Sequence, residues 1–489
     1  MDNITEMIMT TKPYDHQIEA LTKAWGKKGY AYYLEQGTGK SKIIIDEVVN
    51  LIERDLIDCA VIIAPNNVHV NWKMEFIKHM PINYDRVAIQ IWRSNIPLKK
   101  REEETSAIIA SGKVLIFLMN IEALSSDGGK NYLKRILLAR RRTYMAVDES
   151  HKIKTPGAQR TKAIIELGNY TIIRRIATGT EAEEGLEGLW SQFKFLDQNI
   201  IGLRSFTAFK SMYCIENQQQ KASGQIFRQI VGYRNKDILA SRIAPFTYQK
   251  RKKDCLDLPD KVYVTHEIDL TKEQSKIYNQ LQEELIYQLR TGEIVDATMA
   301  ITKMMRLQQV LCGHVNTSDD PKATEIIPSN RTSFVSELVE EASGKCIVFC
   351  RFIMDVQLVV SGLADIGIRS IGVSSRVEGA NRMLEIDRWR QEPNCKALVI
   401  TIASGGTGLT LNEASTTIFY SNNWSGTDRV QAEDRNHRIG QENKVTYHDI
   451  IVPNCVDHRL LSVLKNKKHS ATQFRNITEI QRFLTETID

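Results

Sequence analysis

The sequence predicts an α/β protein built as two similar lobes, each with its own parallel sheet. Ten short β-branched or apolar runs alternate with longer stretches of helical periodicity, a pattern typical of parallel strands covered by helices on both faces. Five runs lie at 30–34, 59–65, 113–120, 143–149 and 172–180, and five at 345–350, 369–375, 396–403, 416–421 and 444–452. The region between the two groups, about 183–315, is expected to be mostly helical.

Chain length and a basic run suggest where the lobes divide. At 489 residues the chain is long for one hydrophobic core, so two or three domains are expected. We expect a first lobe over 1–247 with a helical protrusion at about 183–245, and a basic linker at 248–262. The second lobe would span 263–489, with a helical insertion at about 271–315 and a C-terminal helical tail. The basic run also fits a solvated segment or a chance nuclear-localisation match.

Composition indicates a soluble globular protein. The hydrophobic fraction is 42%, the charged fraction is 25% and the formal net charge is +6. This slight basic excess is compatible with a nucleic-acid partner but does not predict one. The N-terminus lacks the pattern of a signal peptide, and no window approaches 18 uninterrupted apolar residues, so no membrane partner is expected.

The eight cysteines are scattered without a C-x-x-C pair, which indicates free thiols in a reducing compartment. We expect a cytoplasmic protein of a bacterial or phage-infected cell, or a nuclear one if the source is eukaryotic.

A phosphate-binding loop is predicted where the first strand ends, in "EQGTGKS". Gly37 and Gly39 allow the backbone around Thr38 to turn its N–H groups toward phosphate oxygens. Lys40 can reach the β- and γ-phosphates, and the Ser41 hydroxyl can ligate Mg²⁺. The full P-loop pattern would have Gly at position 34, where this chain has Leu. The strand before and the helix after the loop support the assignment.

An acidic pair, Asp148 and Glu149, ends the run "YMAVDESH". Strands often end in polar residues, so the pair on its own fits an acidic strand end as well as a catalytic site. Beside a phosphate loop it has a function: Asp148 would hold Mg²⁺ and Glu149 would orient or deprotonate the attacking water. His151 is expected to have a coupling or structural role.

The second lobe contributes the segment "QAEDRNHRIGQ", residues 431–441. Gln431, Arg435 and Arg438 recur at spacings of four and three, which would place them on one face of a helix. Two arginines directed at one place fit a γ-phosphate whose charge develops in the transition state. A solvated basic helix face is the alternative.

Together these motifs resemble helicase superfamily 2, and within it the Swi/Snf-like double-stranded DNA translocases. The resemblance extends from about residue 13 to about residue 457 and includes "KPYDHQIEAL", "EQGTGKS", "VDESHKIKTPGAQRTKAI", "ATGT", "IVFCRF", "ASGGTGLTL" and "QAEDRNHRIGQ". It implies two RecA-like lobes in tandem, with ATP and Mg²⁺ bound in the cleft between them. Gln17 would read the adenine edge.

The resemblance also implies contacts with the DNA backbone. The candidate residues are Asn66, Trp72, Asn120, Arg351, Thr401, Gly405 and Trp424, and ordinary loop or core packing is the alternative for each. The sequence departs from the family pattern at Glu181, Gln249, Lys250 and Thr410, which affects the expected coupling to DNA rather than the hydrolysis residues.

These features favour a DNA-dependent ATPase that moves along double-stranded or forked DNA, in replication, recombination or repair. The chain is expected to be close to a minimal motor of the fork-remodelling or phage and mobile-element type. A strand-separating helicase is one alternative. An ATP-gated DNA-binding scaffold for a nuclease or another partner is a second.

Overall fold

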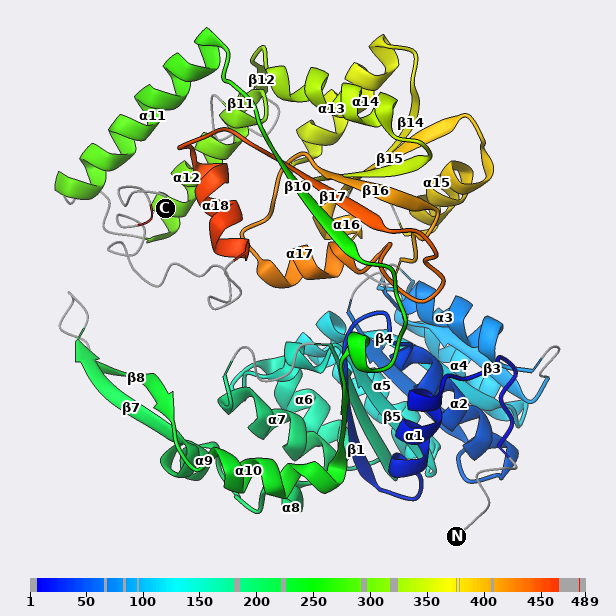
Figure 1. Ribbon diagram of the computed structural model, residues 1–489. Helices are drawn as coiled ribbons and strands as arrows, with labels where there is room; N and C mark the ends of the chain where they lie inside the picture. Colours follow the sequence, from blue (N-terminus) through cyan, green and yellow to red (C-terminus); the bar gives the residue numbers. More distant parts are fainter. Residues whose placement is uncertain are drawn as a thin grey trace. The chain divides into compact units, whose positions relative to one another are not determined.

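The computed structural model contains two compact units, residues 1–257 and 258–489 (Figure 1). It describes residues 7–65, 68–81, 85–94, 96–179, 185–220, 226–291, 297–316, 324–374, 376–377, 379–405, 409–465 and 483. Each unit is built on one parallel sheet with helices on both faces, which confirms the predicted fold class.

The first unit has a seven-stranded sheet in the order β3-β4-β2-β5-β6-β1-β9, and its described pairings are all parallel. In sheet order the strands are β3 Val87–Ile91, β4 Val114–Asn120, β2 Cys59–Ala64, β5 Thr143–Asp148, β6 Ile173–Thr178, β1 Gly29–Leu34 and β9 Thr247–Lys250. The five predicted runs of this lobe are all strands. The edge strands β3 and β9 escaped prediction because they are short and carry no continuous apolar run.

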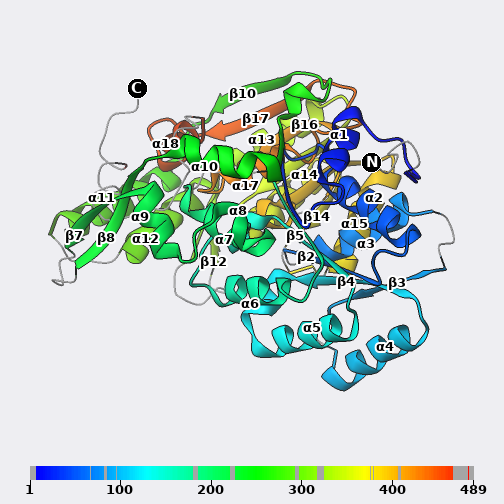
Figure 2. The same cartoon turned by 90° about the horizontal axis from the view of Figure 1, so that it is seen from below.

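Helices cover both faces of this sheet (Figures 1 and 2). On one face lie α1 Asp15–Ala24, α2 Lys40–Glu53 and α3 Val68–His79. On the other lie α4 Leu98–Ala110, the short η2 Ile121–Ser125, α5 Asp127–Ala139, η3 Ser150–Ile153, α6 Gln159–Gly168 and α7 Glu187–Leu196. Successive residues of β1 alternate between the two cores, Tyr32 in one and Tyr33 in the other, which explains why the strands are apolar throughout.

The region expected to be a helical protrusion is only partly helical. It contains α8 Gln198–Ile201, α9 Phe206–Tyr213 and α10 Lys236–Ile243, with η5 Ala244–Phe246 following. Between α9 and α10 an antiparallel hairpin, β7 Cys214–Gln220 and β8 Ile226–Tyr233, projects from the lobe (Figure 1). Its polar composition, "ENQQQ", hid the strand periodicity on which the prediction relied.

The second unit has a six-stranded parallel sheet in the order β10-β17-β16-β13-β15-β14. In that order the strands are β10 Lys261–Glu267, β17 Val445–Ile451, β16 Ala414–Phe419, β13 Lys345–Cys350, β15 Cys395–Thr401 and β14 Arg369–Val373. All five predicted runs are strands here too. The predicted linker, 248–262, contains most of β9, which belongs to the first sheet, and the start of β10, which belongs to the second. The short η6 Lys252–Asp254 lies between these two strands.

Helices of the second unit also pack on both faces of its sheet. One core includes residues of α11 Lys272–Thr291, α12 Ala297–Leu311, α13 Asn330–Glu341, α14 Ile353–Asp365 and α18 Val456–Lys465. The other includes residues of α15 Gly379–Gln391 and α17 Gly426–Glu433, near the short α16 Ile402–Gly405. A two-stranded antiparallel pair, β11 His314–Asn316 and β12 Thr324–Ile326, follows α12.

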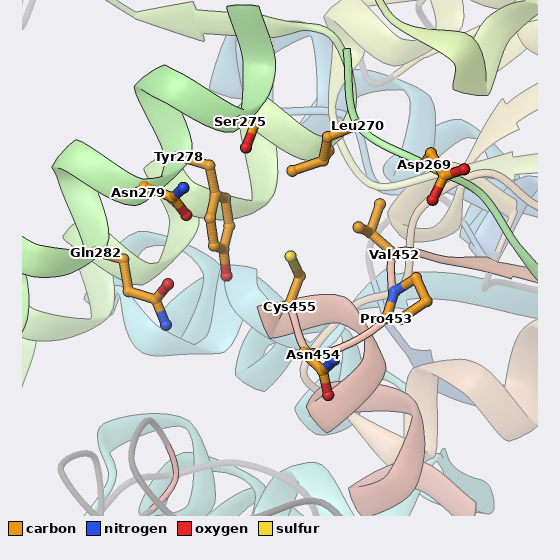
Figure 3. A pocket seen from close by; sticks show the side chains of 10 residues that line it. All are labelled: Asp269, Leu270, Ser275, Tyr278, Asn279, Gln282, Val452, Pro453, Asn454 and Cys455. Atoms are coloured by element: carbon orange, nitrogen blue, oxygen red, sulfur yellow. The ribbon is translucent and has the colours of Figure 1, made fainter. Parts of the chain in front are cut away.

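A hollow of about 600 Å³ lies in the second unit between α11 and the turn from β17 to α18 (Figure 3). Tyr278 stands beside it, and its hydroxyl accepts the Val456 N–H at 2.9 Å. None of the predicted site residues that the structure describes lines this hollow. Within the described segments, no helix combines the length and apolarity needed to cross a membrane.

Candidate functional site

The predicted phosphate loop leaves β1 and enters α2, as the sequence indicated. Gly37 and Gly39 have φ values of +80° and +87°, a backbone region that favours glycine. Gly39 is the N-cap of α2, so the unpaired N–H groups of the first helical turn begin directly after it. Lys40 is the first residue of α2 and Ser41 the second. The loop therefore has the backbone that an anion site at a helix start requires.

Two side chains of this segment hold the loop by hydrogen bonds to nearby backbone carbonyls. The Lys40 ammonium donates to the carbonyl of Leu34 at 2.8 Å, and the Thr38 hydroxyl donates to the carbonyl of Glu35 at 2.7 Å. Gly179, which follows β6, lies close by: a Cβ added there would be 3.4 Å from Lys40 Nζ. The end of β6 thus lies against the loop, and a Cβ at position 179 would come within 2.9 Å of Gln36 Cγ, so it is Gln36 that a side chain there would crowd.

Gln17, the expected adenine reader, is buried at the start of α1 against this loop. Its amide donates to the carbonyl of Thr38 at 3.1 Å, and its Oε1 accepts the Tyr14 N–H at 3.1 Å. An amide group has two donors and two acceptor positions, so one of each is left for a base edge. His16 also bonds the Thr38 carbonyl, at 2.8 Å, and sequence reasoning assigned no role to this histidine.

The acidic pair lies where β5 ends, two strands from β1 in the same parallel sheet. Glu149 has φ +51°, a left-handed conformation that is uncommon for a residue with a side chain and concentrates at functional sites. Its backbone N–H donates to Asp148 Oδ1 at 2.9 Å. The strand therefore ends at Asp148, and the turn at Glu149 presents two carboxylates from adjacent residues.

Electrostatics tie the pair to the phosphate loop. Burial, followed by the neighbouring charge of Glu149, raises the pKa of Asp148 to about 6, while Lys40 and a hydrogen bond from Trp72 act in the opposite direction. Two close carboxylates with one lysine leave an excess of negative charge. Carboxylate and hydroxyl oxygens are the ligands that Mg²⁺ prefers, and it commonly takes only one or two from protein. Asp148 and Ser41 fit that requirement.

Trp72 has a place that differs from the prediction. It was expected to contact DNA, but its side chain is 2% exposed in the core under α3. Its indole N–H donates to Asp148 Oδ2 at 3.0 Å. The residue thus holds the acidic pair and has almost no surface for DNA.

The residues after the acidic pair connect it to neighbouring elements. His151 Nδ1 lies 3.3 Å from a Glu149 carboxylate oxygen and 3.3 Å from the Thr178 hydroxyl at the end of β6. Ser150 is buried and donates to Gln192 of α7 at 2.7 Å. Its hydroxyl therefore anchors the turn to a helix of the lobe.

The arginine segment of the second lobe corrects the predicted helix. Helix α17 ends at Glu433, so only Gln431 lies on it, and Arg435 and Arg438 lie in the turns that follow. The helix ends because the Arg435 N–H bonds the carbonyl three residues back, at Ala432, and the Arg435 carbonyl accepts from Leu411 N at 2.8 Å. The expectation of three residues on one helical face is therefore wrong.

The two arginines nevertheless meet. Arg435 and Arg438 both donate to the carbonyl of Leu409, at 3.3 and 3.1 Å. Buried amides fix this segment to β16: Asn436 donates to Thr417 at 2.8 Å, and Gln441 donates to the carbonyl of Ala414 at 3.3 Å. Both amides stand within "QAEDRNHRIGQ", but the sequence alone did not show that they anchor it.

The remaining candidate DNA contacts have varied surroundings. Asn120 is partly buried at the end of β4 and donates to Glu122 at 3.4 Å. Thr401 is 3% exposed and donates to Ser404 at 2.8 Å, so it has little surface for DNA. Gly405 ends α16. Asn66 lies outside the described residues.

Arg351 and Trp424 have different surroundings in the second lobe: Arg351 contacts a polar side chain, and Trp424 packs against the hydrophobic core. The Arg351 guanidinium donates to Gln308, and burial lowers its pKa to about 10. The other end of the Gln308 amide donates to the carbonyl of Asn422 at 2.8 Å. Trp424 packs edge-on against Phe483, with ring centroids 5.3 Å apart.

Comparison with known proteins agrees with the motif assignment. The model of the SNF2-related domain matches residues 9–316, and that of the helicase conserved C-terminal domain matches residues 330–440. An uncharacterized ATP-dependent helicase of Mycoplasma pneumoniae is 26% identical over 442 residues, covering 89% of this chain and 39% of that protein.

Two further relatives have named roles. The TATA-binding protein-associated factor MOT1 of Saccharomyces cerevisiae is 23% identical, covering 85% of this chain and 24% of that protein. The putative ATP-dependent helicase/translocase YwqA of Bacillus subtilis is 25% identical, covering 70% of this chain and 36% of that protein. The chain thus spans well under half the length of these relatives. Because the SNF2-related domain accounts for most of its 489 residues, the chain belongs to the SNF2-related family of helicase superfamily 2.

Proposed function

We propose that this chain is a DNA-dependent ATPase motor in which ATP hydrolysis drives translocation along double-stranded DNA. The observation that carries the proposal is geometric: the glycine loop joins β1 to α2 at Lys40, and the carboxylates of Asp148 and Glu149 lie at the same end of β5, two strands away in the same parallel sheet. A loop for phosphates, a carboxylate for Mg²⁺ and a second carboxylate for water are the parts that phosphoryl transfer to water needs.

Each first-lobe residue has a defined task in this proposal. Lys40 and the N–H groups at the start of α2 bind the phosphates, while Ser41 and Asp148 hold Mg²⁺. Glu149 orients the attacking water and accepts its proton. Gln17 uses its remaining amide donor and acceptor on the adenine edge.

Arg435 and Arg438 of the second lobe supply positive charge to the transferring phosphoryl group. Their shared approach to the Leu409 carbonyl supports this role, because it brings two guanidinium groups to one acceptor and so concentrates positive charge there. Gln431, one turn earlier on α17, would contact the same nucleotide. Completion of the site would require the two lobes to close around ATP, which is how a nucleotide cycle becomes movement.

DNA is proposed to bind through its phosphates, independently of base sequence. Asn66, Asn120, Arg351, Gly405 and Trp424 remain candidate contacts. The buried Trp72 and Thr401 would support the contacting loops rather than touch DNA themselves. The names of the relatives, helicase and translocase among them, support a motor acting on nucleic acid.

The decisive experiment measures ATP turnover with matched lengths of duplex DNA, single-stranded DNA and RNA. We expect duplex DNA to stimulate turnover most, and stimulation that is greatest with RNA would overturn the proposal. Displacement of a third strand from a DNA triplex measures translocation directly, and displacement of one strand from a fork measures unwinding. The matched control is Glu149→Gln, which should bind ATP but neither hydrolyse it nor move. Normal function of that variant would favour an ATP-gated scaffold instead.

A further inference from the structure

One carbonyl of the phosphate loop is held by two neighbouring side chains of another element. The Thr38 carbonyl accepts from Gln17 Nε2 at 3.1 Å and lies 2.8 Å from His16 Nε2. Both side chains are nearly fully buried, with exposed fractions of 3% and 5%. Because a carbonyl only accepts hydrogen bonds, His16 must carry its proton on Nε2 and donate it.

We propose that His16 is a positioning residue of the phosphate loop, acting through Thr38 and not through the adenine base. The inference rests on the proposed nucleotide site and adds a residue to it. In a planar trans peptide the C=O and the following N–H point in opposite directions. A Thr38 carbonyl held toward α1 therefore turns the Gly39 N–H to the other side of the loop, where phosphate would bind.

The surroundings of Gly39 show how closely α1 fits the loop. A Cβ at position 39 would lie 2.2 Å from Gln17 Nε2, so the loop packs against α1 without room for a side chain. The Thr38 hydroxyl is tied separately to Glu35 at 2.7 Å. The residue is thus held at both its side chain and its carbonyl, and His16 makes the shorter of the two carbonyl bonds.

Gln17 and His16 differ in the hydrogen-bonding groups that they have left after bonding Thr38. Gln17 retains one amide hydrogen and one oxygen lone pair, which suits it to reading a base as well as holding the loop. His16 has its Nε2–H committed to Thr38, and its ring lies against Tyr14 with centroids 5.9 Å apart. Loss of His16 should therefore weaken phosphate binding irrespective of the base, whereas loss of Gln17 should weaken recognition of adenine as well.

Three substitutions test this on the full chain. His16→Gln places an amide donor at the same ε position, His16→Asn withdraws the donor to the δ position, and His16→Phe keeps a ring beside Tyr14 without a donor. Dissociation constants are measured for Mg-ATP and, by competition with a fluorescent ATP analogue, for inorganic tripolyphosphate. Circular dichroism checks that each variant is folded.

We expect His16→Asn and His16→Phe to weaken the binding of ATP and of tripolyphosphate by the same factor, about five- to thirtyfold for one lost buried hydrogen bond. His16→Gln should restore both, and Gln17→Ala should weaken ATP more than tripolyphosphate. Three results would overturn the inference. The first is weaker binding of ATP with unchanged binding of tripolyphosphate, and the second is unchanged binding of both ligands in His16→Asn and His16→Phe. The third is binding by His16→Gln that is as weak as binding by His16→Asn. If the parent chain binds both ligands as expected but DNA fails to stimulate turnover, only the proposed motor function fails.

Discussion

The indole N–H of Trp72 donates to the carboxylate of Asp148 across 3.0 Å, joining helix α3 to the acidic end of β5. Helix α3 follows β2, which pairs with β5 in the sheet, so the contact spans neighbouring strand-and-helix units. In the proposed site, where Asp148 would hold Mg²⁺, a donor that fixes one carboxylate oxygen would help to orient the other.

We predict that Trp72→Phe lowers ATP turnover about tenfold while nucleotide binding is largely kept. The substitution retains an aromatic ring in the core but removes a hydrogen bond to a charged group, which contributes about 1.5–3 kcal/mol. The measurement is kcat and KM for ATP at saturating duplex DNA. Trp92→Phe is the matched control, because Trp92 is also buried in the first lobe and packs on Tyr132 at 5.2 Å. Equal loss of kcat in both variants would show a packing effect only.

Arg435→Ala is predicted to bind ATP but lose turnover by on the order of 10²-fold or more, as expected when a charge-stabilising arginine is removed. Single-turnover hydrolysis and equilibrium nucleotide binding separate the two effects. Arg388→Ala provides the control, since Arg388 is exposed on α15 and pairs with Glu385 of the same helix. Near-normal hydrolysis in Arg435→Ala would contradict an active site that uses both lobes.

Most strands of the two large sheets could be predicted because apolar runs record burial on two faces, whereas the edge strands β3, β9 and β10 were missed. All ten predicted runs became strands, as Tyr32 and Tyr33 of β1 illustrate by entering opposite cores. The β7–β8 hairpin could not be predicted in this way, because an exposed ribbon needs no apolar alternation. Its strands are specified by pairing with each other rather than by a core.

Candidate site residues could be named from the sequence where one residue type suits one chemical task. Lys40, Asp148 and Glu149 could be proposed because a glycine-rich turn, a lysine and paired carboxylates at strand ends together match the needs of phosphoryl transfer. The helix expected through Arg435 ended early where the Leu411 N–H bonds the Arg435 carbonyl, and the Asn436 side chain ties the following turn to Thr417 of β16. Trp72 was assigned to DNA because a sequence does not show which way an indole points. Its acceptor, Asp148, is 76 residues away.

The buried ion pair of Arg175 and Glu47 gives a prediction about stability. The Arg175 Nε lies 3.1 and 3.0 Å from the two Glu47 oxygens, and the Tyr144 hydroxyl donates to Glu47 at 2.9 Å. The pair connects β6 to the helix that begins at the phosphate loop. Arg175→Met should destabilise the first lobe by about 3–5 kcal/mol, because it leaves a buried carboxylate without a cation.

Urea unfolding measures this loss, and the double substitution Arg175→Met with Glu47→Leu tests its cause. Removing both charges should destabilise less than Arg175→Met alone, because no uncompensated charge remains. Lys23→Met breaks an exposed pair with Glu19 and should cost at most about 1 kcal/mol. A double variant that is less stable than Arg175→Met would contradict this account.

The histidine pair His266 and His448 predicts how the stability of the second lobe depends on pH. His266 Nε2 and His448 Nδ1 are 2.8 Å apart on the neighbouring strands β10 and β17, so one ring must be neutral to accept the shared proton. Burial lowers the pKa of both imidazoles, and for His448 the charge of His266 acts in the same direction. The carboxylates of Asp449 and Glu341 oppose this shift.

Both histidines have a folded-state pKa below the unfolded value of about 6.5. At pH values between the folded-state and unfolded-state pKa, the unfolded chain therefore binds more protons than the folded one. The second lobe should therefore lose stability as the pH falls through about 6.5, and His448→Gln should lessen that loss. Unfolding midpoints in urea at pH 7.5 and pH 5.5 give the comparison, with His458→Gln as a control outside the pair. A pH dependence that is the same in His448→Gln as in the parent would show that the histidine pair does not titrate on unfolding.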